Sequence, residues 1–143
     1  MIGMGFDYPD ITKSDVCVRA RGRTMEKAFA DMAIGAFNVV TPIEKIKPMI
    51  EKRVRIEAED AVSLLYEWIE SLIILFDSEM MVFSDFDIRI TTNEKFSLSG
   101  TMRGEKIDPA RHDVHSHIKA VTYHLMKIEK QGNDFVVQAI LDL

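Results

Sequence analysis

Two acidic residues near opposite ends of the chain could bind a metal ion together. Asp15 precedes an alternating apolar segment, residues 16–20, and Asp142 ends another apolar segment just before Leu143. If these segments are neighbouring strands, both carboxylates lie at one edge of a sheet. At a separation of about 4 Å they would repel each other by on the order of 1 to 4 kcal/mol. Calcium removes such repulsion and also accepts main-chain carbonyl oxygens, such as that of Leu143. The alternative is that both residues are ordinary exposed acids.

A second candidate site is a group of histidines. His112, His115 and His117 are closely spaced, and His124 follows seven residues later. If His115 and His117 lie on a strand, both imidazoles point to one face, as a zinc site requires, and His112 could be a third ligand. This reading predicts a zinc-dependent hydrolase. Against it, no cysteine or carboxylate stands at a typical spacing, and residues 108–116 resemble a surface loop with solvated histidines.

One lysine lies within an apolar segment. Lys119 follows Ile118 and precedes Ala120 and Val121, so the pattern places it on a strand with its ammonium on the polar face. From there it could pair with Asp142 or reach an anionic group of a partner as a flexible point charge. The alternative is an ordinary exposed strand lysine.

Composition excludes several classes of function. The net charge of −5 argues against nucleic-acid binding as the main role. It favours binding of a cation or of a basic surface on a partner. No serine has the Gly-x-Ser-x-Gly environment of a hydrolase nucleophile, and the glycines lack phosphate-loop spacings. Cys17 is the only cysteine, which excludes an internal disulfide and suits a reducing cytoplasm. No apolar run approaches the ~18 residues of a membrane span, so a cytoplasmic protein without a membrane partner is expected.

The elements that would position these residues follow from periodicity. Apolar residues recur every three to four positions after Thr24, up to Thr41-Pro42, and again after Asp60, which predicts two helices. Trp68 lies on the second helix and is interpreted as a core residue rather than a binding aromatic. Alternating segments predict strands near residues 16–20, 54–58, 82–90, 96–102, 118–128 and 135–143. The expected fold is α+β: one domain over residues 1–143, with antiparallel sheets of about six strands packed with two main helices.

The sequence resembles the archease family along nearly its whole length. The resemblance is carried by five stretches in order: Asp15–Phe29, Glu59–Trp68, Gly104–Pro109, Lys119–His124 and Ile140–Leu143. The string from Lys119 to His124, together with the aspartate beside Leu143, is the most specific part. One departure is the segment Asp10–Asp15, where the family has Asp-His-Thr-Ala-Asp.

The resemblance implies a function without catalysis. Members of this family are metal-binding activators of the tRNA-splicing RNA ligase that promote its guanylylation and multiple turnover. It implies metal ligation by Asp15, Asp142 and the carbonyl of Leu143, and a functional role for Lys119. The expected cofactor is a divalent metal ion, calcium in the first place, and the expected partner is the ligase, with weak or absent direct tRNA binding.

Two questions stay open at this point. Glu26 or Asp60 could join the metal site, although acids at helix N-termini commonly serve the helix macrodipole. A chaperone-like binding protein without a metal is the remaining alternative function.

Overall fold

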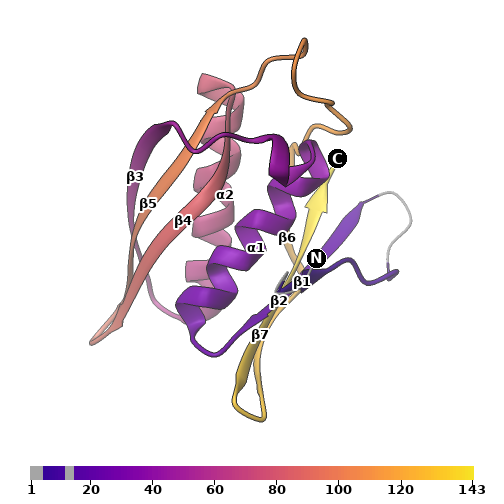
Figure 1. Ribbon diagram of the computed structural model, residues 1–143. Helices are drawn as coiled ribbons and strands as arrows, with labels where there is room; N and C mark the ends of the chain where they lie inside the picture. Colours follow the sequence, from indigo (N-terminus) through magenta and orange to yellow (C-terminus); the bar gives the residue numbers. More distant parts are fainter. Residues whose placement is uncertain (1–4, 12–14) are drawn as a thin grey trace.

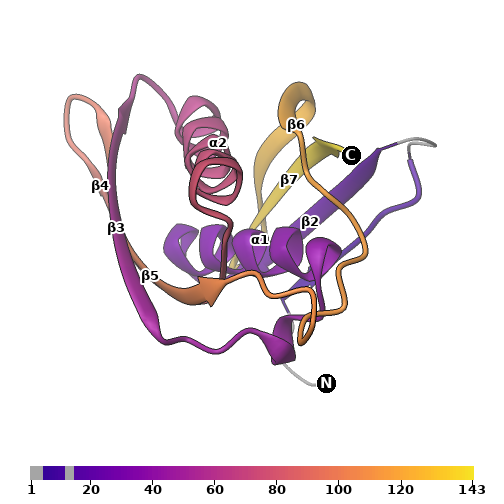
Figure 2. The ribbon, with the colours of Figure 1, turned by 90° about the horizontal axis from the view of Figure 1, so that it is seen from above.

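The computed structural model describes residues 5–11 and 15–143. It has the expected α+β class: two helices, a four-stranded antiparallel sheet and a three-stranded antiparallel sheet. Both helices lie between the two sheets (Figure 2). One cluster of buried apolar side chains from both helices and both sheets forms the core.

The four-stranded sheet has the order β1-β2-β7-β6 (Figure 1). Its strands are β1 (Phe6–Asp7), β2 (Val16–Gly22), β6 (Ala120–Gln131) and β7 (Asp134–Asp142). The turn between β6 and β7 is tight, as expected, because Gly132 adopts the left-handed conformation with φ 62°. The two-residue strand β1 is a seventh strand that periodicity did not predict, since two residues carry no alternation.

The three-stranded sheet has the order β3-β5-β4. Its strands are β3 (Ile50–Ala58), β4 (Met81–Thr92) and β5 (Phe96–Lys106). Residues 98–102 of β5 alternate: Leu98, Gly100 and Met102 are buried against the helices, whereas Ser99 is exposed on the outer face. This sheet therefore has one buried and one solvated face.

The helices begin at the predicted caps. The side chain of Thr24 accepts a hydrogen bond from the Lys27 N–H at 3.1 Å before α1 (Met25–Val40). Asp60 accepts from the Ser63 N–H at 2.8 Å before α2 (Ala61–Glu79). A short 3₁₀ helix, η1 (Ile43–Lys45), follows α1. Within the described residues, no helix is both long and apolar enough to span a bilayer.

Trp68 is a core residue, as predicted. Its ring is fully buried, and its Nε1 donates a hydrogen bond to the carbonyl of Phe29 at 3.0 Å. This contact joins α2 to α1, so the single tryptophan links the two helices between the sheets.

Candidate metal centre

Asp15 and Asp142 lie opposite each other across two central strands. Strands β2 and β7 are antiparallel, and their last pair is Val16 with Leu141. One residue further, the same register aligns Asp15, just before β2, with Asp142, the last residue of β7. Directly opposed residues share a face and have Cβ atoms about 4.5–5.5 Å apart. The expected neighbour relation of the two strands is therefore present.

Both aspartates line one hollow on the outer face of the four-stranded sheet. The other lining residues are Ile11, Thr122, His124, Leu125 and Ile140. The hollow exists because β6 leaves its pairing with β7 between Thr122 and Lys127. Leu125, at the tip of this irregular stretch, has φ 58°, and its carbonyl accepts a hydrogen bond from Gln138 Nε2 at 2.9 Å. The side-chain contact anchors the stretch over the sheet.

The donors available here suit a hard cation. Asp142 is exposed and Asp15 half-buried, and the Leu143 side chain packs against the core at the end of β7. Two carboxylates and the main-chain oxygen of Leu143 are the oxygen ligands that calcium prefers. Across residues 5–11 and 15–143, no three His, Cys, Asp or Glu side chains are grouped closely enough to hold a metal. A calcium ion, which takes six to eight oxygens, would thus need water or a partner's oxygens as well.

Lys119 is joined to Asp142 by the backbone. The Lys119 N–H donates to the carbonyl oxygen of Asp142 at 2.8 Å, one residue before β6 begins. The side chain is exposed and, among the described residues, has no carboxylate within ion-pair distance. The ammonium is therefore available to an outside group rather than paired with Asp142.

The two other acids considered as ligands have different roles. Asp60 caps α2, and the hydrogen bond from the Ser63 backbone lowers the pKa of its carboxyl group. Glu26 accepts a hydrogen bond from the Ile90 N–H at 3.3 Å. It follows the far end of β2, a strand of seven residues, so about 23 Å of extended chain separate it from Asp15. The altered segment Asp10–Asp15 lies partly outside the described residues, at 12–14.

The histidines do not form a cluster. Each contacts a different carboxylate: His112 meets Glu105 at 3.0 Å, His115 meets Asp113 at 3.1 Å, and His117 meets Asp77 at 3.0 Å. The interpretation of these residues as a zinc site of a hydrolase is wrong, because residues 107–119 form no strand that would align the imidazoles.

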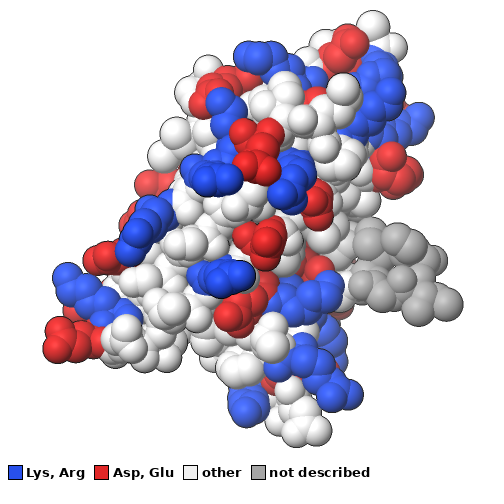
Figure 3. All heavy atoms as spheres, turned by 60° about the vertical axis from the view of Figure 1, so that its left-hand side comes forward, with Lys and Arg blue, Asp and Glu red and all other residues white. Residues whose placement is uncertain are grey.

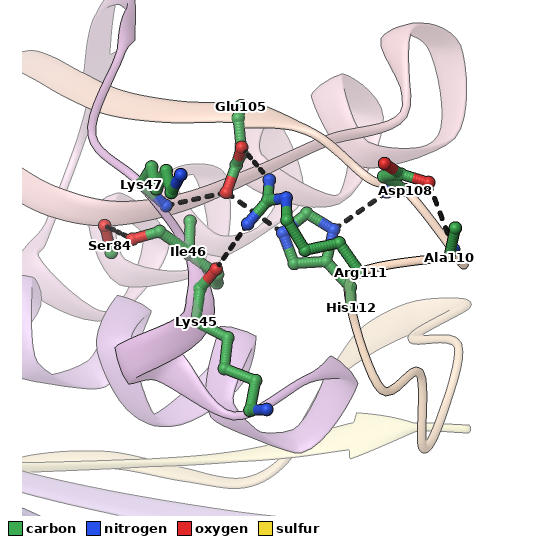
Figure 4. A network of polar contacts seen from close by, with 9 residues as sticks. All are labelled: Lys45, Ile46, Lys47, Ser84, Glu105, Asp108, Ala110, Arg111 and His112. Atoms are coloured by element: carbon green, nitrogen blue, oxygen red, sulfur yellow. Dashed lines mark hydrogen bonds and ion pairs between the residues drawn. The ribbon is translucent and has the colours of Figure 1, made fainter.

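The expectation of solvated histidines is also wrong for His112, which is only 2% exposed. Figure 4 shows its ring between Glu105 and Asp108. Its Nδ1 accepts a hydrogen bond from the Asp108 N–H at 2.8 Å, so the proton stands on Nε2, facing the Glu105 carboxylate. The ring thus holds the 107–119 loop against β5.

Glu105 is the centre of this network. Its carboxylate also accepts from the Lys47 N–H at 2.7 Å and pairs with Arg111, which reaches on to the carbonyl of Lys45 at 3.2 Å. Burial alone would raise the pKa of Glu105, but the hydrogen bonds from Lys47, His112 and Arg111 together lower it. With every donor already engaged, the network has a structural role. It ties the segment after α1 to the loop after β5.

Sequence reasoning missed two parts of this arrangement. His124 and Thr122 line the same hollow as the aspartates, and the irregular stretch of β6 that places them has no periodicity signal. Glu105 stands in a stretch that carries the family resemblance, but no role was predicted for it. Alternation after the buried residues Met102 and Gly104 would expose its side chain, so the sequence pattern gives no signal of its burial.

Fold and site together define a class: a small α+β domain with two helices between two antiparallel sheets and an aspartate pair at the end of two central strands. The family model "Archease protein family (MTH1598/TM1083)" matches residues 6–143. The chain belongs to the archease family.

Similarity to individual proteins supports this family membership. "Protein archease" of Sulfurisphaera tokodaii is 40% identical over 130 residues, covering 91% of this chain and 93% of that protein. "Protein archease" of Pyrococcus furiosus is 41% identical over 118 residues, covering 82% and 83%. The solution structure of Methanobacterium thermoautotrophicum protein 1598 superposes with a TM-score of 0.86 at 35% identity, covering 98% of this chain and 99% of that one.

Proposed function

We propose that this archease-family chain is a metal-binding activator of the tRNA-splicing RNA ligase, with no catalytic step of its own. It would promote guanylylation of the ligase and so permit multiple turnover. The observation that supports this most is the register of β2 and β7, which sets Asp15 opposite Asp142. Two opposed carboxylates are destabilising unless a cation lies between them.

The metal would be held by Asp15, Asp142 and the main-chain oxygen of Leu143. A divalent ion there neutralises the carboxylates and, because the chain fills only part of its coordination shell, leaves positions for oxygens of a partner. Calcium suits this donor set better than magnesium, which demands a stricter octahedron.

Lys119 would act toward the ligase rather than toward the metal. Its side chain is exposed, and the backbone bond to Asp142 fixes the main chain of Lys119 beside the end of β7. A flexible point charge in this place can contact an anionic group of the ligase's nucleotide site once the two proteins dock.

A reconstituted ligation reaction tests the proposal. The ligase is present at a lower concentration than the tRNA halves. The amount of ligated RNA is measured with and without this protein, in calcium, magnesium, manganese or chelator. Stimulation beyond one turnover per ligase, dependent on the cation, is expected. Equal product with and without the protein in every metal would contradict it.

A chaperone-like binding protein is the second candidate. The related Thermotoga maritima structure, 19% identical with a TM-score of 0.55, is described as "an archease, possible chaperone". In this chain Ile11 is 50% exposed and Leu125 46% exposed, and both line the hollow that holds the aspartates. Suppression of the aggregation of unrelated proteins, unaffected by chelator, would favour this function over the first.

A further inference from the structure

The outer face of the three-stranded sheet contains a second hollow, remote from the aspartates. It has a volume of about 400 Å³ and lies along the central strand β5. Small side chains form its floor and long ones form its walls, since Ser99 and Thr101 of β5 lie between arginines of β3 and residues of β4. The helices cover the opposite face, so the hollow opens to solvent.

Two arginines face each other across this hollow. Arg55 of β3 and Arg89 of β4 are both register partners of Ser99, so the three residues form one row across the sheet. Two strand spacings separate the arginines, which is about 10 Å. Their long side chains can converge above the Ser99 hydroxyl, which is itself a hydrogen-bond donor.

The other arginines of this face are already paired. Arg53 contacts Glu51 at 3.2 Å, and Arg103 contacts Glu51 at 3.2 Å and Asp85 at 3.0 Å. Figure 3 shows this intermixing of basic and acidic side chains on the side that carries β3, β4 and β5.

Arg55 and Arg89 differ from these arginines. In the part of the chain that the structure describes, neither has a carboxylate within ion-pair distance. One acid, Asp87, lines the hollow with them. Two unpaired guanidinium groups against one carboxylate leave a single net positive charge, which matches one monoanionic group.

We propose that Arg55, Arg89 and Ser99 bind one phosphate group. Guanidinium forks match phosphate oxygens with parallel hydrogen bonds, and two forks converging on one anion also relieve the repulsion between them. No aromatic residue lines the hollow, so the contact is to the phosphate and not to a stacked base. This site is independent of the metal centre and of the proposed ligase activation.

Titration with inorganic phosphate, followed by two-dimensional NMR of the labelled protein, tests the site. Sodium chloride at matched ionic strength is the reference. Phosphate should shift the signals of Arg55, Arg89 and Ser99 in a saturable way. Arg55→Gln and Arg89→Gln should each weaken binding about tenfold. The matched control is Arg23→Gln, which removes an exposed arginine beyond the end of β2 and should leave binding unchanged.

Ser99→Asp is the second variant. It places a carboxylate between the two arginines, so it should abolish the phosphate response and raise the midpoint of thermal unfolding. A single-stranded oligonucleotide distinguishes the source of the phosphate: shifts of the same signals identify a nucleic-acid backbone, and a response to free phosphate alone identifies a small phosphorylated ligand. Shifts that do not saturate, or that persist in both arginine variants and in Ser99→Asp, overturn the proposal.

Discussion

The backbone N–H of Lys119 donates to the carbonyl oxygen of Asp142 at 2.8 Å. This bond extends the pairing of β6 with β7, whose last pair is Ala120 with Asp142. Since β2 aligns Asp15 on the other side of Asp142, the backbones of Lys119, Asp142 and Asp15 lie side by side at the end of three adjacent strands. Their positions depend on backbone hydrogen bonds, so side-chain substitutions can test function without removing the fold.

Asp15→Asn should separate metal binding from stability. In chelator the variant should be as stable as the original protein or more stable by up to about 1 kcal/mol, because one of two opposed charges is gone. With calcium at 100 times its dissociation constant, the original protein should gain about 2.7 kcal/mol of unfolding free energy, and the variant much less. Denaturant unfolding in chelator and in calcium measures both the stability without metal and the stability gained from calcium.

Glu94→Gln is the control for this comparison. It removes an exposed acid in the turn between β4 and β5 and should leave the calcium effect intact. An equal calcium effect in Asp15→Asn and in the original protein would refute ligation by Asp15.

Lys119→Ala should abolish ligase stimulation and leave the fold intact. The side chain is exposed and its structural bond is made by the backbone, so unfolding free energy should change by less than about 0.5 kcal/mol. Lys119→Arg should restore part of the activity if charge alone matters. Lys130→Ala, at the exposed far end of β6, is the matched control and should stimulate normally. Full stimulation by Lys119→Ala would remove the lysine from the mechanism.

Glu105→Gln should weaken the fold and change its pH dependence. Its pKa is lowered in the folded state, while the unfolded value is about 4.3, so its contribution is present above that pH and is lost as the pH falls through the folded value. The substitution should cost about 2 kcal/mol at pH 7, since buried donors lose a charged acceptor. The difference between the two proteins should shrink below about pH 4, as urea unfolding from pH 3 to 7 would measure. If the two proteins differed in unfolding free energy by the same amount from pH 3 to 7, the lowered pKa of Glu105 in the folded protein would be contradicted.

Trp68→Phe should destabilise the link between the helices. The variant loses the buried hydrogen bond to the Phe29 carbonyl and leaves a cavity beside it, which together should cost about 2–4 kcal/mol. Chemical unfolding followed by circular dichroism measures the cost. Tyr123→Phe, an exposed aromatic on β6, should change stability by much less.

Much of the fold could be predicted from periodicity and capping residues. The stripe of apolar residues after Asp60 identified α2, and alternation identified β2 and β5, because each element buries one face. Strand β1 and the irregular stretch of β6 were not predictable in this way. The first is too short for a period, and the second depends on the tertiary bond from Gln138 to Leu125.

The candidate site, like the fold, could be predicted from the sequence only in part. Asp15 and Asp142 were placed together from the assumption that their strands are neighbours, and that pairing is observed. The histidine spacing was misleading because His112 is buried in a loop by Glu105, a residue near the end of β5. Local spacing cannot indicate which distant carboxylate a loop residue will meet.

The most direct test of ligase activation is the number of RNA ligations per ligase molecule at limiting ligase and saturating calcium. The original protein should raise this number well above one, and Asp142→Asn, added at the same concentration and shown to be folded, should leave it near the value without activator. Full stimulation by Asp142→Asn would contradict the role of the aspartate pair, and no stimulation by the original protein in any metal would contradict the proposed function itself.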